Sequence, residues 1–72
     1  MEEAMEEIYK GNKIATKSYE LQSGEWMPEV RVSSIIAGGV NVQRLFGQMP
    51  SPSKELADTA AIQMGKCWTD SN

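Results

Sequence analysis

Few side chains in this chain are suited to catalysis or metal binding. Its 72 residues include no histidine and a single cysteine, Cys67. A zinc or iron–sulfur site within one chain needs several cysteine or histidine ligands. Without histidine, the usual general base and the Ser-His and Cys-His nucleophile pairs are also missing. The carboxylates left for acid–base work, Glu20, Glu25 and Glu29, lie near a predicted turn with no sign of a pocket. The sequence therefore predicts a protein that is not an enzyme, with no catalytic residues, no metal and no cofactor.

The charges are distributed unevenly along the chain. The net charge is −3, yet four glutamates fall within the first seven residues and five of the seven lysines and arginines fall between residues 8 and 48. We expect residues 1–7 to form an acidic N-terminal tail, either solvated or able to cover a basic face, with a frayed helical turn as the alternative. Residues 8–72 are predicted to form one domain.

Candidate binding residues lie on the predicted strands, where basic side chains alternate with large apolar ones. Glu29 and Arg31 are two positions apart and share one face of a strand, where a solvated ion pair is the ordinary outcome. Tyr19 and Met27 are candidates for an exposed apolar patch. The full set of candidate binding residues is Lys13, Lys17, Tyr19, Met27, Glu29, Arg31 and Arg44.

One helix is predicted over residues 52–68. Ser51 is placed to cap its free N–H groups, and Pro52 suits the first helical position because it lacks an N–H. Ile62 points away from the predicted apolar face, and Gly65 either admits a close strand or marks a fraying last turn. Cys67, on the apolar face, is expected to be an inert buried thiol. That face comprises Leu56, Ala57, Ala60, Ala61, Met64, Cys67 and Trp68.

Three strands are predicted before this helix, at residues 13–21, 25–36 and 40–49. Turn signals separate them at Gly11-Asn12, at residues 22–25, where Gly24 supplies a positive φ, and at residues 37–39. Pro28 cannot donate to a ladder, so the second strand should begin at an edge or a bulge. The short connections favour an antiparallel sheet. The prediction is an α+β fold, β-β-β-α, in which one C-terminal helix covers one face of a three-stranded meander.

Length and composition limit the remaining possibilities. A 72-residue chain makes one domain, and a domain of this size buries only about 60% of its unfolded surface, so dimerisation would help it. No apolar run approaches the roughly 20 residues that span a bilayer. The acidic N-terminus also lacks the basic and then apolar stretch of a signal peptide. We therefore expect a cytoplasmic protein that has no membrane partner.

Several short segments carry two resemblances to known proteins. They are YKG at 9–11, GEWMPEVRV at 24–32, LFG at 45–47, SKELA at 53–57 and GKCWTD at 65–70. Over most of the chain this pattern is similar to a group of small bacterial proteins of unknown function with the same sheet-then-helix order. That resemblance implies a fold but no activity.

The first four of these segments more weakly resemble the DNA-binding domain of plant ethylene-response factors. That resemblance implies a three-stranded sheet laid in the major groove, with strand arginines and tryptophans reading bases. The family has a dense run of arginines across its first two strands, whereas the predicted sheet here has only Arg31 and Arg44. The residues it nominates are Lys10, Lys13, Lys17, Trp26, Glu29, Arg31 and Arg44.

Two functional hypotheses follow, both placed on the sheet face opposite the helix. The first is a non-catalytic binding or regulatory module that contacts a protein partner or forms a homodimer, with Tyr19, Met27 and Leu45 near the open side. The alternative is nucleic-acid binding through the sheet's basic residues, which requires that those residues share one face. Phosphate contacts would make that second activity steeply dependent on salt.

Overall fold

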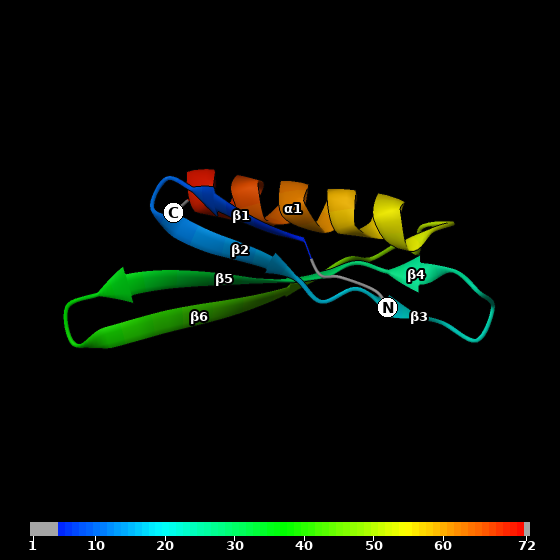
Figure 1. The fold of residues 1–72 in the computed structure, drawn as a ribbon, viewed down its shortest axis with the longest axis horizontal. Helices are drawn as coiled ribbons and strands as arrows, with labels where there is room; N and C mark the ends of the chain where they lie inside the picture. Colours follow the sequence, from blue (N-terminus) through cyan, green and yellow to red (C-terminus); the bar gives the residue numbers. More distant parts are fainter. Residues whose placement is uncertain (1–4, 72) are drawn as a thin grey trace.

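The chain folds into an antiparallel sheet crossed by one helix (Figure 1). The computed structural model describes residues 5–71, except for the side chain of Ile36. In chain order, the elements within these residues are β1 (Glu6–Tyr9), β2 (Asn12–Thr16), β3 (Tyr19–Glu20), β4 (Trp26–Met27), β5 (Glu29–Ile36), β6 (Gly39–Phe46) and α1 (Lys54–Ser71).

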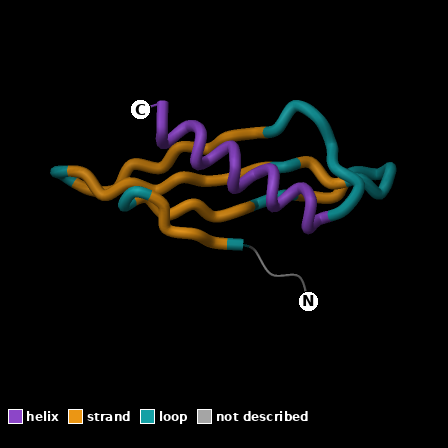
Figure 2. Tube along the Cα trace, turned by 90° about the horizontal axis from the view of Figure 1, so that it is seen from above, coloured by secondary structure: helices purple, strands orange, loops and turns teal. Residues whose placement is uncertain are grey.

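The main sheet has the strand order β1-β2-β5-β6, and each neighbouring pair is antiparallel. β3 and β4 form a separate two-stranded sheet. Seen from above, α1 runs obliquely across one side of the main sheet (Figure 2). The α+β class with one C-terminal helix is confirmed, but the predicted number of strands is wrong, because the main sheet has four strands rather than three.

The additional strand comes from the acidic start of the chain. β1 pairs with β2 across a two-residue loop, Lys10-Gly11, one position earlier than the predicted turn. Both loop residues have positive φ, 50° and 82°, which is the type I′ geometry that matches strand twist. The predicted end of the acidic tail, after Glu7, therefore falls inside β1, and residues 1–4 lie outside the described part. Cross-strand pairing has overridden the helical preference of the glutamates.

The first two predicted strands are each interrupted. The segment 13–21 is divided into β2 and β3, and the segment 25–36 is divided into β4 and β5 with Pro28 between them. The interruption at Pro28 agrees with its missing N–H. The last strand, β6, ends at Phe46 instead of Met49, and Gly24 has the expected positive φ of 91° in the β3–β4 connection.

The helix begins two residues later than predicted, because Ser51 is engaged elsewhere. Ser51 exchanges two backbone hydrogen bonds with Trp26, at 2.7 and 2.8 Å. Ser53 is the capping residue, since its Oγ accepts a hydrogen bond from the Leu56 N–H at 3.2 Å. α1 then continues three residues beyond the predicted end, to Ser71.

The core lies between α1 and the two central strands, β2 and β5. Ile14, Val30 and Val32 are fully buried under the helix. The helix meets them with Ala57, Ala61 and Gly65, which recur at every fourth position and so lie on one helix face. Ile62 and Asp58 are the other buried residues of the helix. Partly buried side chains complete this cluster; they are Tyr9, Leu45, Met64 and Trp68.

The predicted apolar face of the helix was therefore rotated from the true one. Ile62, predicted to point away, is only 6% exposed, whereas Leu56 is 53% exposed and Cys67 is exposed rather than buried. A helical wheel based on hydrophobicity alone assigns the large apolar side chains to the buried face. Close packing of a helix on a sheet selects the smallest side chains for that face. Asp58 is tolerated inside because Lys54 Nζ lies 2.7 Å from its Oδ2.

Replacement of Gly65 by alanine should destabilise the fold. At an exposed position within a helix, a change from glycine to alanine increases the stability of the helix by about 1 kcal/mol. Here the new Cβ would lie 2.7 Å from Ile14 Cγ2, and overpacking of this kind costs about 1–3 kcal/mol. Urea unfolding should therefore show a lower midpoint for Gly65→Ala. The exposed Gln63→Ala should leave the midpoint nearly unchanged, and in an Ile14→Ala background Gly65→Ala should be neutral or stabilising. A stabilised single variant would contradict the close contact.

Candidate binding face

The uncovered side of the main sheet is the candidate site, and strand alternation determines its residues. Ile14, Val30 and Val32 face the helix, so the residues between them and their cross-strand partners face away. We call this surface the open face. It consists of Glu6, Ile8, Lys13, Ala15, Glu29, Arg31, Ser33, Ile35, Val40, Val42, Arg44 and Phe46.

The open face carries five large apolar side chains that are exposed to solvent. Ile35 and Val40 are direct cross-strand partners beside the β5–β6 turn, and Val42 and Ile8 lie in the next row of the sheet. Phe46 lies at the other end of β6. The exposed fractions are Ile8 70%, Ile35 87%, Val40 65%, Val42 50% and Phe46 55%. Sequence reasoning did not select these residues, because the alternation along β6 separates two faces without showing which one the helix covers.

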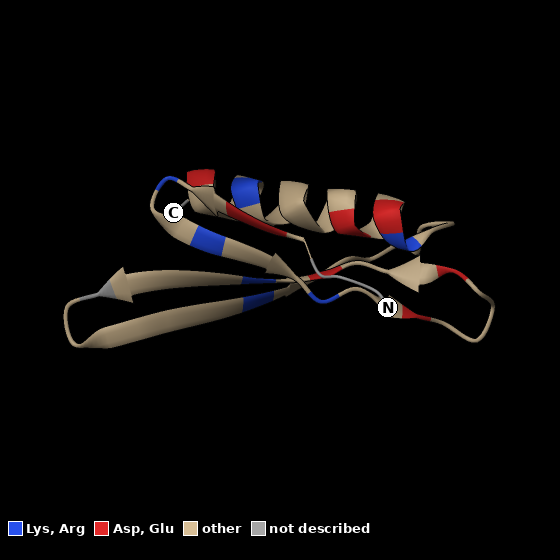
Figure 3. Cartoon of the chain, viewed as in Figure 1, with Lys and Arg blue, Asp and Glu red and all other residues tan. Residues whose placement is uncertain are grey.

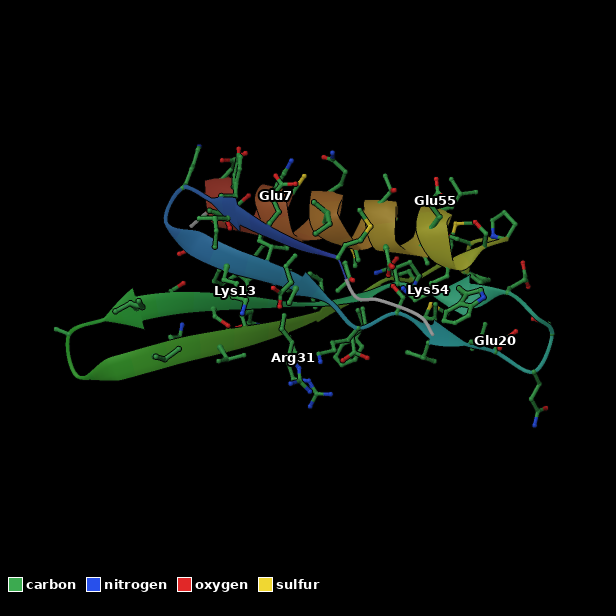
Figure 4. The ribbon with its side chains drawn as sticks, in the orientation of Figure 1. Glu7, Lys13, Glu20, Arg31, Lys54 and Glu55 are labelled. Atoms are coloured by element: carbon green, nitrogen blue, oxygen red, sulfur yellow. The ribbon has the colours of Figure 1, made fainter. Side chains whose placement is uncertain are left out.

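Three of the predicted basic residues lie together on this face. Lys13 is in one row, and Arg31 and Arg44 are direct cross-strand partners in the next. Figure 3 shows their blue segments on neighbouring strands, and Figure 4 shows Arg31 projecting from the sheet on the side away from α1. Like charges directly opposite each other repel, so this row favours an anion between or beside the two guanidinium groups.

Two carboxylates partly neutralise this basic cluster. Arg44 Nη2 lies 3.3 Å from Glu29 Oε2, and Glu29 is only 8% exposed. The Arg44 guanidinium is also 5.6 Å from the centre of the Phe46 ring, within the range of a cation–π contact. Lys13 Nζ lies 3.4 Å from Glu6 Oε2. Among the described residues, Arg31 makes no ion pair and is the exposed cation best placed to meet a partner.

The remaining predicted residues lie elsewhere. Tyr19 and Met27 are direct cross-strand partners, so the structure does bring them together, but in the separate β3–β4 sheet, where Met27 is half-buried. Lys17 follows β2, and its backbone N–H donates to the Glu29 carbonyl at 2.7 Å. Leu45, predicted near the open side, packs against the core on the helix side.

A second charged cluster joins the β1–β2 turn to the end of the helix. The Tyr9 hydroxyl donates to Asp70 Oδ2 at 3.0 Å, and Lys10 Nζ donates to Oδ1 of the same carboxylate. The hydrogen bonds from Lys10 and Tyr9 lower the pKa of Asp70, and the same contact with Asp70 raises the pKa of Lys10. Lys66 Nζ also lies 2.7 Å from Glu7 Oε2. These contacts hold β1 against α1 and leave the open face free.

No similarity to known proteins assigns a function to this surface. Comparison of the chain with protein-family models, with curated proteins and with solved structures gives no match in any of the three. Within residues 5–71, no group of three or more acidic or cysteine side chains is arranged to hold a metal ion. The described residues also form no helix with the apolar length needed to cross a membrane.

Removal of the Asp70 charge should lower stability in a pH-dependent way. The folded-state pKa of Asp70 lies below its ordinary value of 3.8, so its contribution is present above that value and is lost as the pH falls through the folded pKa. We expect Asp70→Asn to unfold at a lower urea concentration than the original chain at neutral pH, with the difference disappearing in acid. Glu20→Gln, at an exposed position, is the control. A difference that persists at low pH would rule out the charged contact.

Proposed function

We propose that this protein is a non-catalytic binding module that contacts a protein partner through the open face. One observation carries the proposal: five large apolar side chains, each at least half exposed, gather on the side of the sheet that the helix does not cover. A single exposed apolar residue is ordinary, but several of them on one uncovered sheet face are typical of an interaction site. The residues are Ile8, Ile35, Val40, Val42 and Phe46.

The charges on the open face indicate the chemistry of the partner. Arg31 and Arg44 lie between the apolar group near the β5–β6 turn and the ring of Phe46. Arginine forms paired hydrogen bonds with carboxylates and is enriched, with aromatic residues, at protein interfaces. The surface therefore suits a partner segment that offers apolar side chains together with aspartate or glutamate.

Site-specific photocrosslinking tests this proposal. A photoreactive amino acid at Ile8, which is exposed on the open face and three strands away from β6, should give one defined adduct with another protein in the cells that produce this chain. The same group at Gln63, exposed on the helix, is the matched control and should give none. Arg31→Glu should reduce the adduct at Ile8, because the carboxylates that we expect on the partner would then be repelled.

Two outcomes of the crosslinking would overturn the protein-binding proposal. One is the absence of any adduct at Ile8, and the other is an equal pattern of adducts at Ile8 and Gln63. An Arg31→Glu variant that lost its fold would give no information, so circular dichroism should first show an unchanged spectrum. The replacement sets opposite charges on the Arg31–Arg44 cross-strand pair, which favours folding.

Nucleic-acid binding is the second candidate, because three of the basic residues nominated for it lie together on the open face. Lys13, Arg31 and Arg44 share one face of the sheet and lie in neighbouring rows. Their order across β2, β5 and β6 forms a short basic line suited to a phosphate backbone. Two observations argue against nucleic-acid binding. The net charge is −3, and Lys13 and Arg44 are each paired with a glutamate.

The salt dependence of binding to duplex DNA or RNA distinguishes the two candidates. Three phosphate contacts would give a slope of about −2.7 for log K against log salt, a loss of about 40-fold between 50 and 200 mM salt. Arg31→Ala should then reduce the magnitude of the slope by about 1. Fluorescence anisotropy with a labelled duplex measures this directly. An anisotropy that does not change even at low salt would eliminate the nucleic-acid candidate.

A further inference from the structure

The strand β6 lies at the edge of the main sheet and is open to solvent. It is last in the strand order, and seven of its eight residues are exposed, with Leu45 the exception. An edge strand presents unpaired backbone N–H and C=O groups that attract another strand. The backbone groups of β6 that point outward therefore need hydrogen-bond partners.

Two hydrogen bonds determine the outward groups. The Gly47 N–H donates to the Pro28 carbonyl at 2.9 Å, and the Lys17 N–H donates to the Glu29 carbonyl at 2.7 Å. In an antiparallel pair, residues that bond to the neighbouring strand alternate with residues that do not. Odd-numbered residues of β6 therefore bond to β5, and even-numbered residues direct both backbone groups away from the sheet. The outward residues are Val40, Val42, Arg44 and Phe46.

This edge lacks the features that normally prevent strand pairing. β6 has eight residues, no proline and one charged side chain, Arg44. By contrast, the opposite edge strand, β1, has four residues and begins with Glu6 and Glu7. Short length, charge and proline are the usual protections of an edge. β1 is short and charged, whereas β6 is long and has the single charge of Arg44.

We propose that β6 pairs antiparallel with β6 of a second copy of this chain, across a two-fold axis that passes through Gln43. Residues facing each other in an antiparallel pair must point to the same side of the sheet, so the axis passes through one residue rather than between two. With the axis at Gln43, Val40 faces Phe46 of the second copy. Val42 faces Arg44 of the second copy in the same way, and all outward residues of both strands find partners.

The neighbouring registers satisfy fewer groups. An axis at Val42 leaves Phe46 facing Gly38 in the turn. An axis at Arg44 places the two Arg44 side chains directly opposite each other, where like charges repel. In the Gln43 register, each Arg44 faces a valine and keeps its own Glu29, 3.3 Å away. Within the described residues of one copy, the Arg44 carbonyl accepts a long 3.4 Å hydrogen bond from Gln43 Nε2. A strand N–H of the second copy would replace this bond.

This pairing goes beyond the proposed function and does not depend on it. It uses backbone groups of the sheet edge, whereas partner binding uses side chains of the open face. A two-fold axis perpendicular to the sheet keeps both helices on one side. The two open faces then become one continuous surface across both copies. A domain this small gains from such an assembly, because it buries little surface on its own.

Cysteine crosslinking tests the register. In a Cys67→Ser background, which removes the exposed native thiol, Gln43→Cys places two cysteines at a non-hydrogen-bonded pair with Cα atoms about 4.5 Å apart. That separation suits a disulfide, so mild oxidation should convert most of the chain to a covalent dimer. Asn41→Cys is the matched control on the same strand and the same side of the sheet. Its two copies would lie about 13 Å apart and should not be linked.

A backbone variant tests the pairing without a crosslink. Val42→Pro removes an outward N–H and leaves the β5–β6 hydrogen bonds intact, while Val42→Thr keeps that N–H. Light scattering should give twice the 8.0 kDa chain mass for the original chain and for Val42→Thr, and close to 8.0 kDa for Val42→Pro.

Three results would overturn the proposed pairing. They are a monomeric original chain at high protein concentration, linkage of Asn41→Cys in place of Gln43→Cys, and an unchanged dimer in Val42→Pro. Failure here can be told apart from failure of partner binding. Arg31→Glu should reduce the photocrosslink at Ile8 and keep the disulfide at position 43. A chain that stays monomeric but still gives the defined adduct at Ile8 would overturn the pairing alone.

Discussion

The close contact of α1 with β2 and β5 is the constraint on which the rest of the structure depends. Ala57, Ala61 and Gly65 let the helix approach the sheet until an added Cβ at Gly65 would lie 2.7 Å from Ile14 Cγ2. A single helix is about 10–12 Å across with its side chains, and neighbouring strands are about 4.8 Å apart. One helix centred over β2 and β5 therefore cannot cover all four strands on its own side, and it leaves the other side of the sheet uncovered.

Charged contacts with the helix are present at the β1 edge of the main sheet, whereas the β6 edge is exposed to solvent. At the β1 edge, the Lys66–Glu7 pair and the hydrogen bond from Tyr9 to Asp70 tie the strand to the helix. Most residues of β6 at the other edge have exposed side chains. Ion pairs between exposed groups contribute little individually, but the Lys66–Glu7 pair places the Glu7 carboxylate against the helix. The basic groups Arg31 and Arg44 then remain on the open face.

Local signals in the sequence predicted the helix, an irregularity near Pro28 and the turn at Gly24, because each depends on a few adjacent residues. The full break between β4 and β5 at Pro28 was not predicted. The sequence did not predict β1, because a run of glutamates is typical of a solvated tail when its partner strand is not known. It also failed to orient the helix, because hydrophobicity favoured Leu56 over the small residues that packing selects. The candidate site was predictable only in part. Alternation placed Glu29 and Arg31 on one face of a strand, but the pairing of Arg31 with Arg44 required the register.

The geometry of antiparallel strands links the open face to the β6 edge. Side-chain direction and backbone hydrogen-bond direction both alternate with a period of two residues. Val40, Val42, Arg44 and Phe46 consequently present side chains to the open face and backbone groups to the edge. If two copies join at this edge, the residues nearest the axis belong to both surfaces, and a partner that lay across the axis would contact both copies at once. Its binding would then strengthen the pairing of the copies, because a ligand that prefers the paired state stabilises that state by mass action.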